Sequence, residues 1–143
     1  MALDNGSGRT PGAPDGPGVQ RIGQIAVRVQ DLDRAVAFYR DVLELPFLFQ
    51  APPGLAFFDC GGVRLMLSRP ETPEQDHPGS IIYYLVADLP AAWTALVGRG
   101  AAIVSEPHLL ARMPDHDLWM GFINDSEGNV LGLMSEVRPP ARA

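Results

Sequence analysis

The sequence predicts an α+β fold built from two tandem βαβββ modules that form an open, cup-shaped sheet. The first observation is an internal repeat, in which VQDLDRAVAFY (residues 29–39) matches VADLPAAWTAL (residues 86–96). The second is that GGVRLMLS (residues 61–68) matches EGNVLGLM (residues 127–134) later in each half. Similar segments in the same order indicate a duplicated supersecondary unit.

The 143 residues divide into one domain and two tails. Residues 1–20 are rich in Gly and Pro and poor in large apolar side chains, which predicts a disordered tail. The polar stretch RPETPEQDHPG separates the two halves of the domain. We therefore predict a domain over 21–137, with modules over 21–69 and 79–137, a linker over 70–78 and a short tail over 138–143.

In the first module, Ile25, Val27 and Val29 alternate with more polar residues, which predicts a strand over 22–30. Asp31 is a suitable N-cap for the helix that follows. That helix has apolar residues at helical spacing: Leu32, Ala35, Val36, Tyr39, Val42 and Leu43. Short strands are then predicted over 47–50, 55–59 and 63–68.

The second module repeats this pattern. Apolar residues at the same helical phase are Leu89, Ala92, Trp93, Leu96 and Val97, and Gly98 and Gly100 end the helix. The matching strands are predicted over 101–105, 118–124 and 130–135. Residues 106–117 are expected to form a loop over the mouth of the cup.

Alternation along the strands assigns their two faces. Ile25, Val27 and Val29 are expected under the helix, which leaves Gln24 and Arg28 on the opposite, inner face. The same reasoning adds further residues from both modules to that inner face: Arg64, Met66, Ile81, Tyr83, Gly132 and Met134. A concave face of mixed polarity is a suitable place for a small ligand.

Composition excludes several classes of function. The net charge is −6, with 11 basic against 17 acidic residues and no Lys/Arg cluster, which argues against a nucleic-acid partner. No apolar run approaches the ~18 residues that span a bilayer, so no membrane partner is expected. A single Cys60 and an N-terminus without a secretory pattern predict a cytoplasmic protein.

Three segments together resemble the vicinal oxygen chelate superfamily, which includes glyoxalases, epimerases, extradiol dioxygenases and bleomycin-resistance proteins. They are QIAVRVQDLDRAVAFYRDVLEL (residues 24–45), VADLPAAW (residues 86–93) and FINDSEGNVLGLM (residues 122–134). The last departs from the family pattern by Ser126 in place of the usual Pro. The resemblance implies paired βαβββ modules, a small-molecule ligand and a homodimer.

The resemblance also implies a divalent metal held by the first and fourth strands of each module. The corresponding positions here are Gln24, Met66, Ile81 and Gly132, of which only Gln24 has a suitable donor atom. A hard divalent ion needs several oxygen or imidazole donors. We therefore expect no metal cofactor, with a metal held by displaced ligands as the less favoured alternative.

Polar residues of the inner face are candidates for substrate binding. Gln24 can bind a ligand or a neighbouring strand. Arg28 and Arg64 favour a carboxylate or phosphate through paired hydrogen bonds, and Arg28 corresponds to an arginine that helps hold the anionic substrate in glyoxalase I. The alternatives are a salt bridge between the modules for Arg28 and a solvated side chain for Arg64.

His108 and His116 are candidate catalytic residues of the predicted loop. His116 lies between Asp115 and Asp117, which favours its protonated form and suits a general acid or base. The alternative is a hydrogen bond that orders the loop. A metal site built from both histidines and a neighbouring Asp is a further, less favoured interpretation.

Tyr83, Trp119 and Met134 are expected to form an apolar ligand wall or, alternatively, part of the core. Trp119 is ambiguous because Leu118, Met120 and Phe122 on the other phase of its strand are equally apolar.

These observations lead to three alternative hypotheses about the function. The first is a binding protein for a small organic anion, which sequesters its ligand or catalyses a metal-free isomerase or lyase step. The second is a metal-dependent lyase, isomerase or dioxygenase with displaced ligands. The third is an interaction protein whose cup has lost its ligand.

Overall fold

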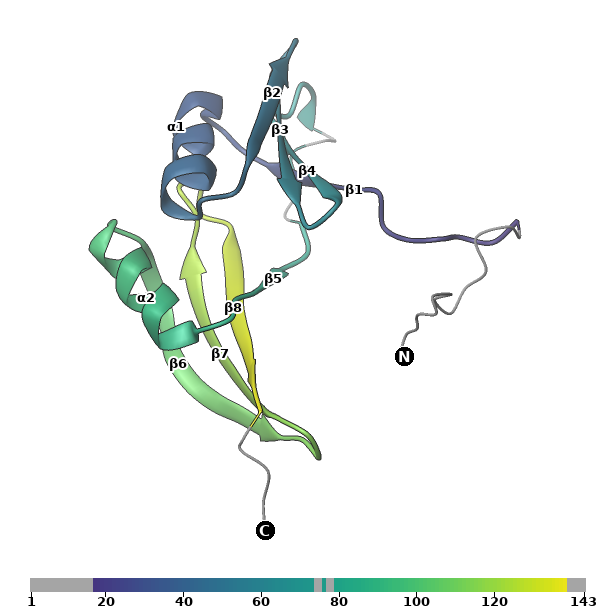
Figure 1. Ribbon diagram of the computed structural model, residues 1–143. Helices are drawn as coiled ribbons and strands as arrows, with labels where there is room; N and C mark the ends of the chain where they lie inside the picture. Colours follow the sequence, from purple (N-terminus) through teal and green to yellow (C-terminus); the bar gives the residue numbers. More distant parts are fainter. Residues whose placement is uncertain (1–16, 74–75, 77–78, 139–143) are drawn as a thin grey trace.

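Two four-stranded sheets, each packed against one helix, make up the fold (Figure 1). The computed structural model describes residues 17–73, 76 and 79–138. Most of the predicted tails, and part of the predicted linker, lie outside the described residues. None of the described helices combines the length and the apolar character needed to cross a bilayer.

The first module has the predicted βαβββ order. Its strands are arranged β1-β4-β3-β2, with β1 parallel to β4 and the other neighbours antiparallel. The elements are β1 (Gln24–Arg28), α1 (Leu32–Ala37), η1 (Phe38–Val42), β2 (Phe47–Ala51), β3 (Leu55–Cys60) and β4 (Val63–Ser68).

The second module repeats that topology, with the order β5-β8-β7-β6 and β5 parallel to β8. Its elements are β5 (Ile82–Leu85), α2 (Leu89–Gly98), β6 (Ala102–Arg112), β7 (Asp117–Asn124) and β8 (Val130–Val137). The two sheets are open, and the predicted fold class is confirmed.

Both helices begin at an aspartate, because its carboxylate accepts a hydrogen bond from an N–H that has no partner within the helix. The Asp31 carboxylate accepts from the Arg34 N–H at 3.0 Å, and the Asp88 carboxylate accepts from the Ala91 N–H at 3.1 Å. The predicted N-cap at Asp31 is confirmed.

One continuous core joins the modules. Val27 and Val29 of the first module, Leu89 and Trp93 of the second, and Ile123 of β7 all belong to it. The predicted assignment of Ile25, Val27 and Val29 to the helix side agrees with the burial of Val27 and Val29. The helix-covered faces of both sheets contribute to this core. The opposite faces of the two sheets are therefore more exposed.

The predicted loop over 106–117 is wrong. β6 continues to Arg112, and a tight turn follows in which the Met113 N–H donates to the His116 carbonyl at 2.7 Å. Pro107 suggested a loop because it lacks an N–H, but β6 is the edge strand of its sheet, where this loss is tolerated. A shift in register between Ser105 and His108 accommodates it.

Candidate functional site

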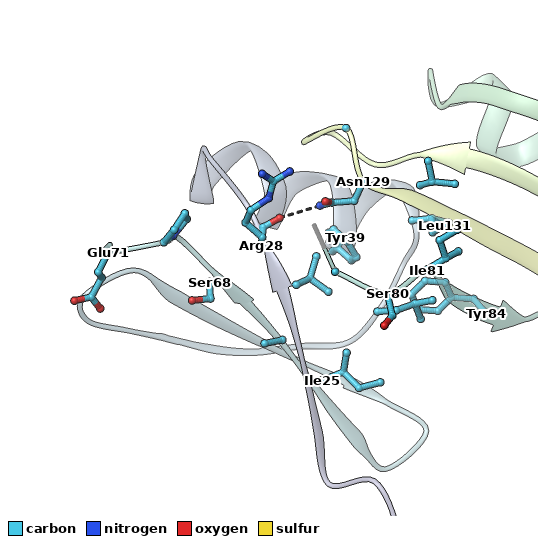
Figure 2. A pocket seen from close by; sticks show the side chains of 17 residues that line it. Ile25, Arg28, Tyr39, Ser68, Glu71, Ser80, Ile81, Tyr84, Asn129 and Leu131 are labelled. Carbon is cyan, nitrogen blue, oxygen red and sulfur yellow. Dashed lines mark hydrogen bonds between the residues drawn. The ribbon is translucent and has the colours of Figure 1, made fainter. Parts of the chain in front are cut away.

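A cavity of about 700 Å³ lies at the seam between the modules, and residues of the edge strands β1 and β5 both line it (Figure 2). Its walls combine apolar and polar side chains. Apolar residues in the lining include Ile25, Val27, Ile81, Ile82, Val130 and Leu131. The polar residues in the lining are Arg28, Tyr39, Ser68, Glu71, Ser80, Tyr84 and Asn129.

Arg28 ends β1 and brings a positive charge to this cavity. Its Nη1 donates to the Asp76 carboxylate at 2.8 Å, whereas its Nε is buried and has no hydrogen-bond partner. Its side chain is only 29% exposed. A buried N–H without a partner is destabilising, so this group is suited to donate a hydrogen bond to an oxygen of a bound molecule.

Tyr84 contributes the second such atom. Its hydroxyl is buried without a hydrogen-bond partner. Burial, together with the negative charge of Asp125, raises the pKa of Tyr84 well above its usual range, so the hydroxyl keeps its proton. Within the described part of the chain, Arg28 Nε and Tyr84 Oη are the two buried side-chain polar atoms without a partner, and both residues line the same cavity.

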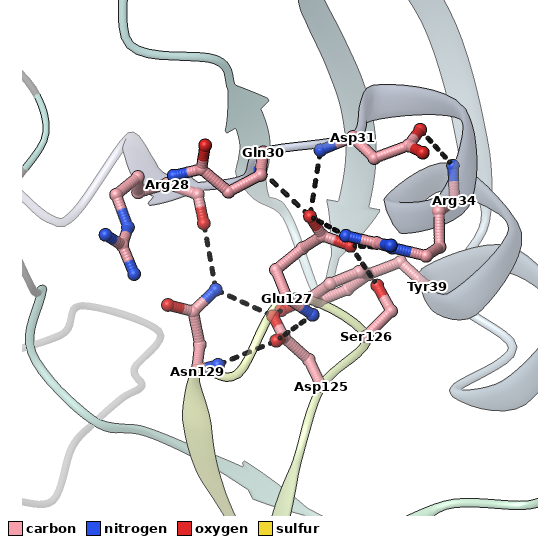
Figure 3. Close-up of polar contacts among 9 residues, drawn as sticks. All are labelled: Arg28, Gln30, Asp31, Arg34, Tyr39, Asp125, Ser126, Glu127 and Asn129. Atoms are coloured by element: carbon pink, nitrogen blue, oxygen red, sulfur yellow. Dashed lines mark hydrogen bonds and ion pairs between the residues drawn. The ribbon is translucent and has the colours of Figure 1, made fainter.

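The turn between β7 and β8, residues 125–129, holds this region together (Figure 3). The buried Asp125 carboxylate accepts from the Tyr39 hydroxyl at 2.7 Å and from the Asn129 side-chain amide at 2.9 Å. The Asn129 amide also donates to the Arg28 carbonyl at 2.8 Å. The turn therefore fixes the end of β1 that carries the Arg28 side chain.

Glu127 attaches the same turn to the start of α1 (Figure 3). Its carboxylate is fully buried and accepts from the N–H groups of Gln30 and Asp31 at 2.9 Å and from Arg34 Nε at 2.7 Å. Burial alone raises its pKa, but these hydrogen bonds outweigh burial and lower the pKa of Glu127 to about 2. The residue is a structural anion that connects the two modules.

The predicted inner-face residues lie in three separate regions: the seam cavity, one face of the first sheet and one face of the second sheet. Arg28 and Ile81 line the seam cavity, together with Ile25 and Val27 of the helix-facing set. Residues from both faces of β1 line the cavity, because the cavity lies between the edges of the two sheets and not on a single curved surface. The sequence also led us to expect one cavity lined by six of the inner-face residues, and the seam cavity has only two of them in its lining. The six are Gln24, Arg28, Met66, Ile81, Tyr83 and Gly132.

Gln24, Arg64 and Met66 share one face of the first sheet, as alternation predicted, but they are not part of the cavity lining. Gln24 Nε2 donates to Met66 Sδ at 3.6 Å. The Arg64 guanidinium lies 5.8 Å from the centre of the Phe57 ring. A role for these three residues in substrate binding stays a prediction.

Tyr83, Gly132 and Met134 share the corresponding face of the second sheet, also outside the cavity lining. The Tyr83 ring lies across Gly132, since a Cβ there would be 2.7 Å from Tyr83 Cδ2. The Tyr83 and Phe122 rings meet edge to face at 5.8 Å.

Trp119 lies on the opposite face of that sheet, so its placement in a wall with Tyr83 is wrong. The regular pairing of β7 with β8 puts Trp119 on the same face as Gly121 and Ile123. That face is the one packed against α2, because a Cβ at Gly121 would be 2.7 Å from the Trp93 ring.

Neither predicted catalytic histidine lines the cavity. His108 lies within β6 opposite Met120, and its Nδ1 is 3.1 Å from the Glu106 carbonyl. His116 closes the β6–β7 turn, with Nδ1 2.7 Å from the Asp115 carboxylate. The hydrogen bond with His116 holds the pKa of Asp115 below its usual value. In this position His116 orders the turn, which was the alternative interpretation.

The family metal positions do not fit a divalent ion. Gln24 faces the Met66 thioether, Ile81 is an alkyl side chain and Gly132 offers no donor atom. A hard cation would therefore have one amide oxygen among these side chains, fewer than such an ion requires. The described residues also contain no cluster of three or more His, Cys, Asp or Glu side chains with the arrangement of a metal site.

Tyr84, Asp76 and Asn129 belong to the candidate site but were not predicted as such. Tyr84 alternates with Tyr83, which was assigned to the inner face, and Asp76 lies in the predicted linker. Asn129 is part of the segment that carries the family resemblance, which was its one available signal.

Paired βαβββ modules with two open four-stranded sheets define the fold class of the chain. Residues 21–133 match the family model of the Glyoxalase/Bleomycin resistance protein/Dioxygenase superfamily. The chain therefore belongs to this superfamily, and the resemblance predicted from the sequence is confirmed. No curated protein matches the chain.

Solved structures agree with this assignment. A superfamily member from Sphaerobacter thermophilus has a TM-score of 0.70 at 19% identity, over 82% of this chain and 98% of that one. An integron cassette protein from V. cholerae has a TM-score of 0.68 at 14% identity, over 82% and 96%. A lactoylglutathione lyase from Agrobacterium tumefaciens has a TM-score of 0.60 at 25% identity, over 82% and 95%. These similarities support the fold.

Proposed function

We propose that this chain binds a small organic anion with an apolar body in the seam cavity, without the metal that is common in its superfamily. The observation that carries the proposal is that Arg28 Nε and Tyr84 Oη, two buried donors without partners, belong to residues lining one cavity. A ligand that offers acceptor oxygens to both groups would give each buried donor the hydrogen bond that it lacks.

Charge and shape support the same ligand class. A carboxylate suits the planar guanidinium of Arg28 because both groups can form two parallel hydrogen bonds. The apolar lining from Ile25, Val27 and Leu131 suits an aliphatic or aromatic body. The cavity volume of about 700 Å³ falls within the range of small-molecule sites.

Sequestration is the better-supported mode of action. Metal-free catalysis was expected to use His108 or His116, and neither lines the cavity. A metal-dependent lyase or isomerase with displaced ligands is the alternative that the experiment must distinguish. The interaction-protein alternative predicts that no small molecule binds.

Isothermal titration calorimetry with phenylacetate, phenylacetamide and phenethylammonium tests the proposal directly. These probes share an aromatic body and differ in charge. We expect phenylacetate to bind best and Arg28→Met to weaken that binding by roughly 1.5–3 kcal/mol, as for a charge-assisted hydrogen bond. Arg64→Met is the matched control, because Arg64 does not line the cavity.

Preference for the neutral or cationic probe, with no effect of Arg28→Met, would overturn the anion site. Metal content is measured in parallel on protein purified without chelators. Close to one equivalent of a divalent ion, lost in Gln24→Ala, would favour the metal-dependent enzyme.

A further inference from the structure

We propose that Asp76 is an internal competitor that occupies Arg28 and sets the affinity of the seam cavity for carboxylates. This inference rests on the proposed function, since it concerns the same cavity. It identifies a residue that controls specificity and that lies in the connection between β4 and β5, 48 positions from Arg28 along the chain.

The contact between Asp76 and Arg28 resembles the one that a ligand carboxylate would make. Asp76 Oδ1 lies 2.8 Å from Arg28 Nη1, which is the length of a charge-assisted hydrogen bond. The guanidinium is only partly satisfied by this contact, because Arg28 Nε remains buried and without a partner. Asp76 therefore neutralises the charge of Arg28 without using the full donor capacity of the group.

The ion pair is also weak enough to be exchanged. The side chain of Asp76 is 42% exposed, and ion pairs with exposed partners contribute little net stability because water competes for both groups. A ligand carboxylate that reaches Nε and the adjacent Nη2 would make two hydrogen bonds, while its apolar body packs on the cavity wall. Asp76, on Nη1, would then compete with this ligand for the single positive charge of Arg28.

The opposite role for Asp76 makes the opposite prediction. If Asp76 served to orient Arg28 for the ligand, its removal would weaken anion binding. If it competes with the ligand, its removal takes away the carboxylate that pairs with Arg28 and strengthens anion binding. The sign of the change in affinity thus distinguishes a competitor from a positioning residue.

The experiment compares wild-type protein, Asp76→Asn and the control Asp33→Asn by calorimetric titration with phenylacetate and phenylacetamide. Asp33→Asn makes the same change in net charge in the first turn of α1, away from the cavity lining. We expect Asp76→Asn to bind phenylacetate roughly three- to tenfold more tightly, which is the scale of a weak ion pair that no longer competes. Phenylacetamide binding should stay unchanged, and Asp33→Asn should behave as wild type.

The double variant Arg28→Met/Asp76→Asn should lose the gain, because the competitor acts only through Arg28. Equal or weaker phenylacetate binding by Asp76→Asn, with clear binding by the wild type, overturns the competitor role and leaves the proposed function intact. Absence of phenylacetate binding in both proteins overturns both proposals. Thermal unfolding of each variant confirms that the compared proteins are folded.

Discussion

The side-chain amide of Asn129 donates a hydrogen bond to the backbone carbonyl of Arg28 at 2.8 Å. The two residues come from different modules, and the hydrogen bond lies next to the seam cavity that both residues line (Figure 2). The β7–β8 turn thus holds in place the strand end that presents the candidate anion-binding side chain.

Replacing Asn129 with Ala should lower the free energy of unfolding by about 1–3 kcal/mol. The change removes one donor from the Arg28 carbonyl and one from Oδ2 of the buried Asp125 carboxylate, which keeps the Tyr39 hydroxyl as a donor. Urea unfolding measures the effect. Asn124→Ala, at the end of β7, is the control and should change stability much less, whereas equal losses in both variants would contradict the role assigned to Asn129.

Glu127→Gln should make the protein less stable at neutral pH and less sensitive to acid. The pKa of Glu127 is lowered from 4.5 to about 2 in the folded chain, so its ionisation stabilises the fold fully above pH 4.5. This contribution, on the order of 3 kcal/mol, decreases as the pH falls from 4.5 towards 2. The glutamine side chain cannot ionise, so that part of the pH dependence should disappear.

Denaturant unfolding at several pH values between 2 and 7 checks this expectation. Glu136→Gln serves as the matched control, because Glu136 is exposed on β8 and pairs with Arg138 near the end of the described chain. A wild-type profile retained in Glu127→Gln would show that another group controls acid unfolding.

The contacts of Glu127 and Asn129 also show the limit of reasoning from the sequence. The segment DSEGN was recognised as part of a family pattern, but its partners at Arg28, Gln30 and Arg34 lie more than 90 positions away. Local patterns predicted both helices, the N-cap at Asp31 and most of the strands, because those depend on neighbouring residues. The contact between modules depends on how two sheets are placed in space.

The candidate site also combines features that local patterns predict with features that depend on how the two sheets are placed. Alternation correctly placed Gln24, Arg28, Arg64 and Met66 on one face, since parallel pairing of β1 with β4 keeps their phase. It could not place the cavity, which lies between two sheet edges. Both faces of the strand that carries Trp119 are apolar, so alternation could not assign Trp119 to one of them. The assignment comes from Gly121, which shares the face of Trp119 and lies against Trp93 of α2.

That contact leads to a prediction about the second module. Gly121→Ala should destabilise the fold by about 1–3 kcal/mol, because the added methyl group would lie 2.7 Å from the Trp93 ring and 3.2 Å from the Pro107 backbone. Gly98→Ala is the control, since nothing lies within 4 Å of a Cβ at that last position of α2. Thermal unfolding should show a loss for Gly121→Ala and no loss for Gly98→Ala. Equal behaviour of the two variants would mean that Trp93 moves aside at little cost.

The last prediction concerns assembly. The superfamily resemblance implies a homodimer, and the second module exposes apolar side chains in and beside β5. Ile81 and Tyr83 are each 47% exposed and Leu85 is 67% exposed. Leu85 is also paired with Met134, which extends the apolar surface across the sheet. Apolar side chains gathered on one face are typical of a surface that another protein covers.

A second copy of this chain is the expected partner. Light scattering at micromolar concentration should give twice the mass of one chain. Leu85→Asp should shift the mass towards the monomer, because the carboxylate would lose its water in the interface without a compensating partner. Val97→Asp, on the exposed side of α2, places the same charge at a 43% exposed valine and should leave the dimer intact. A monomer mass for the unaltered protein, or equal dissociation in both variants, would show that this face does not form the interface.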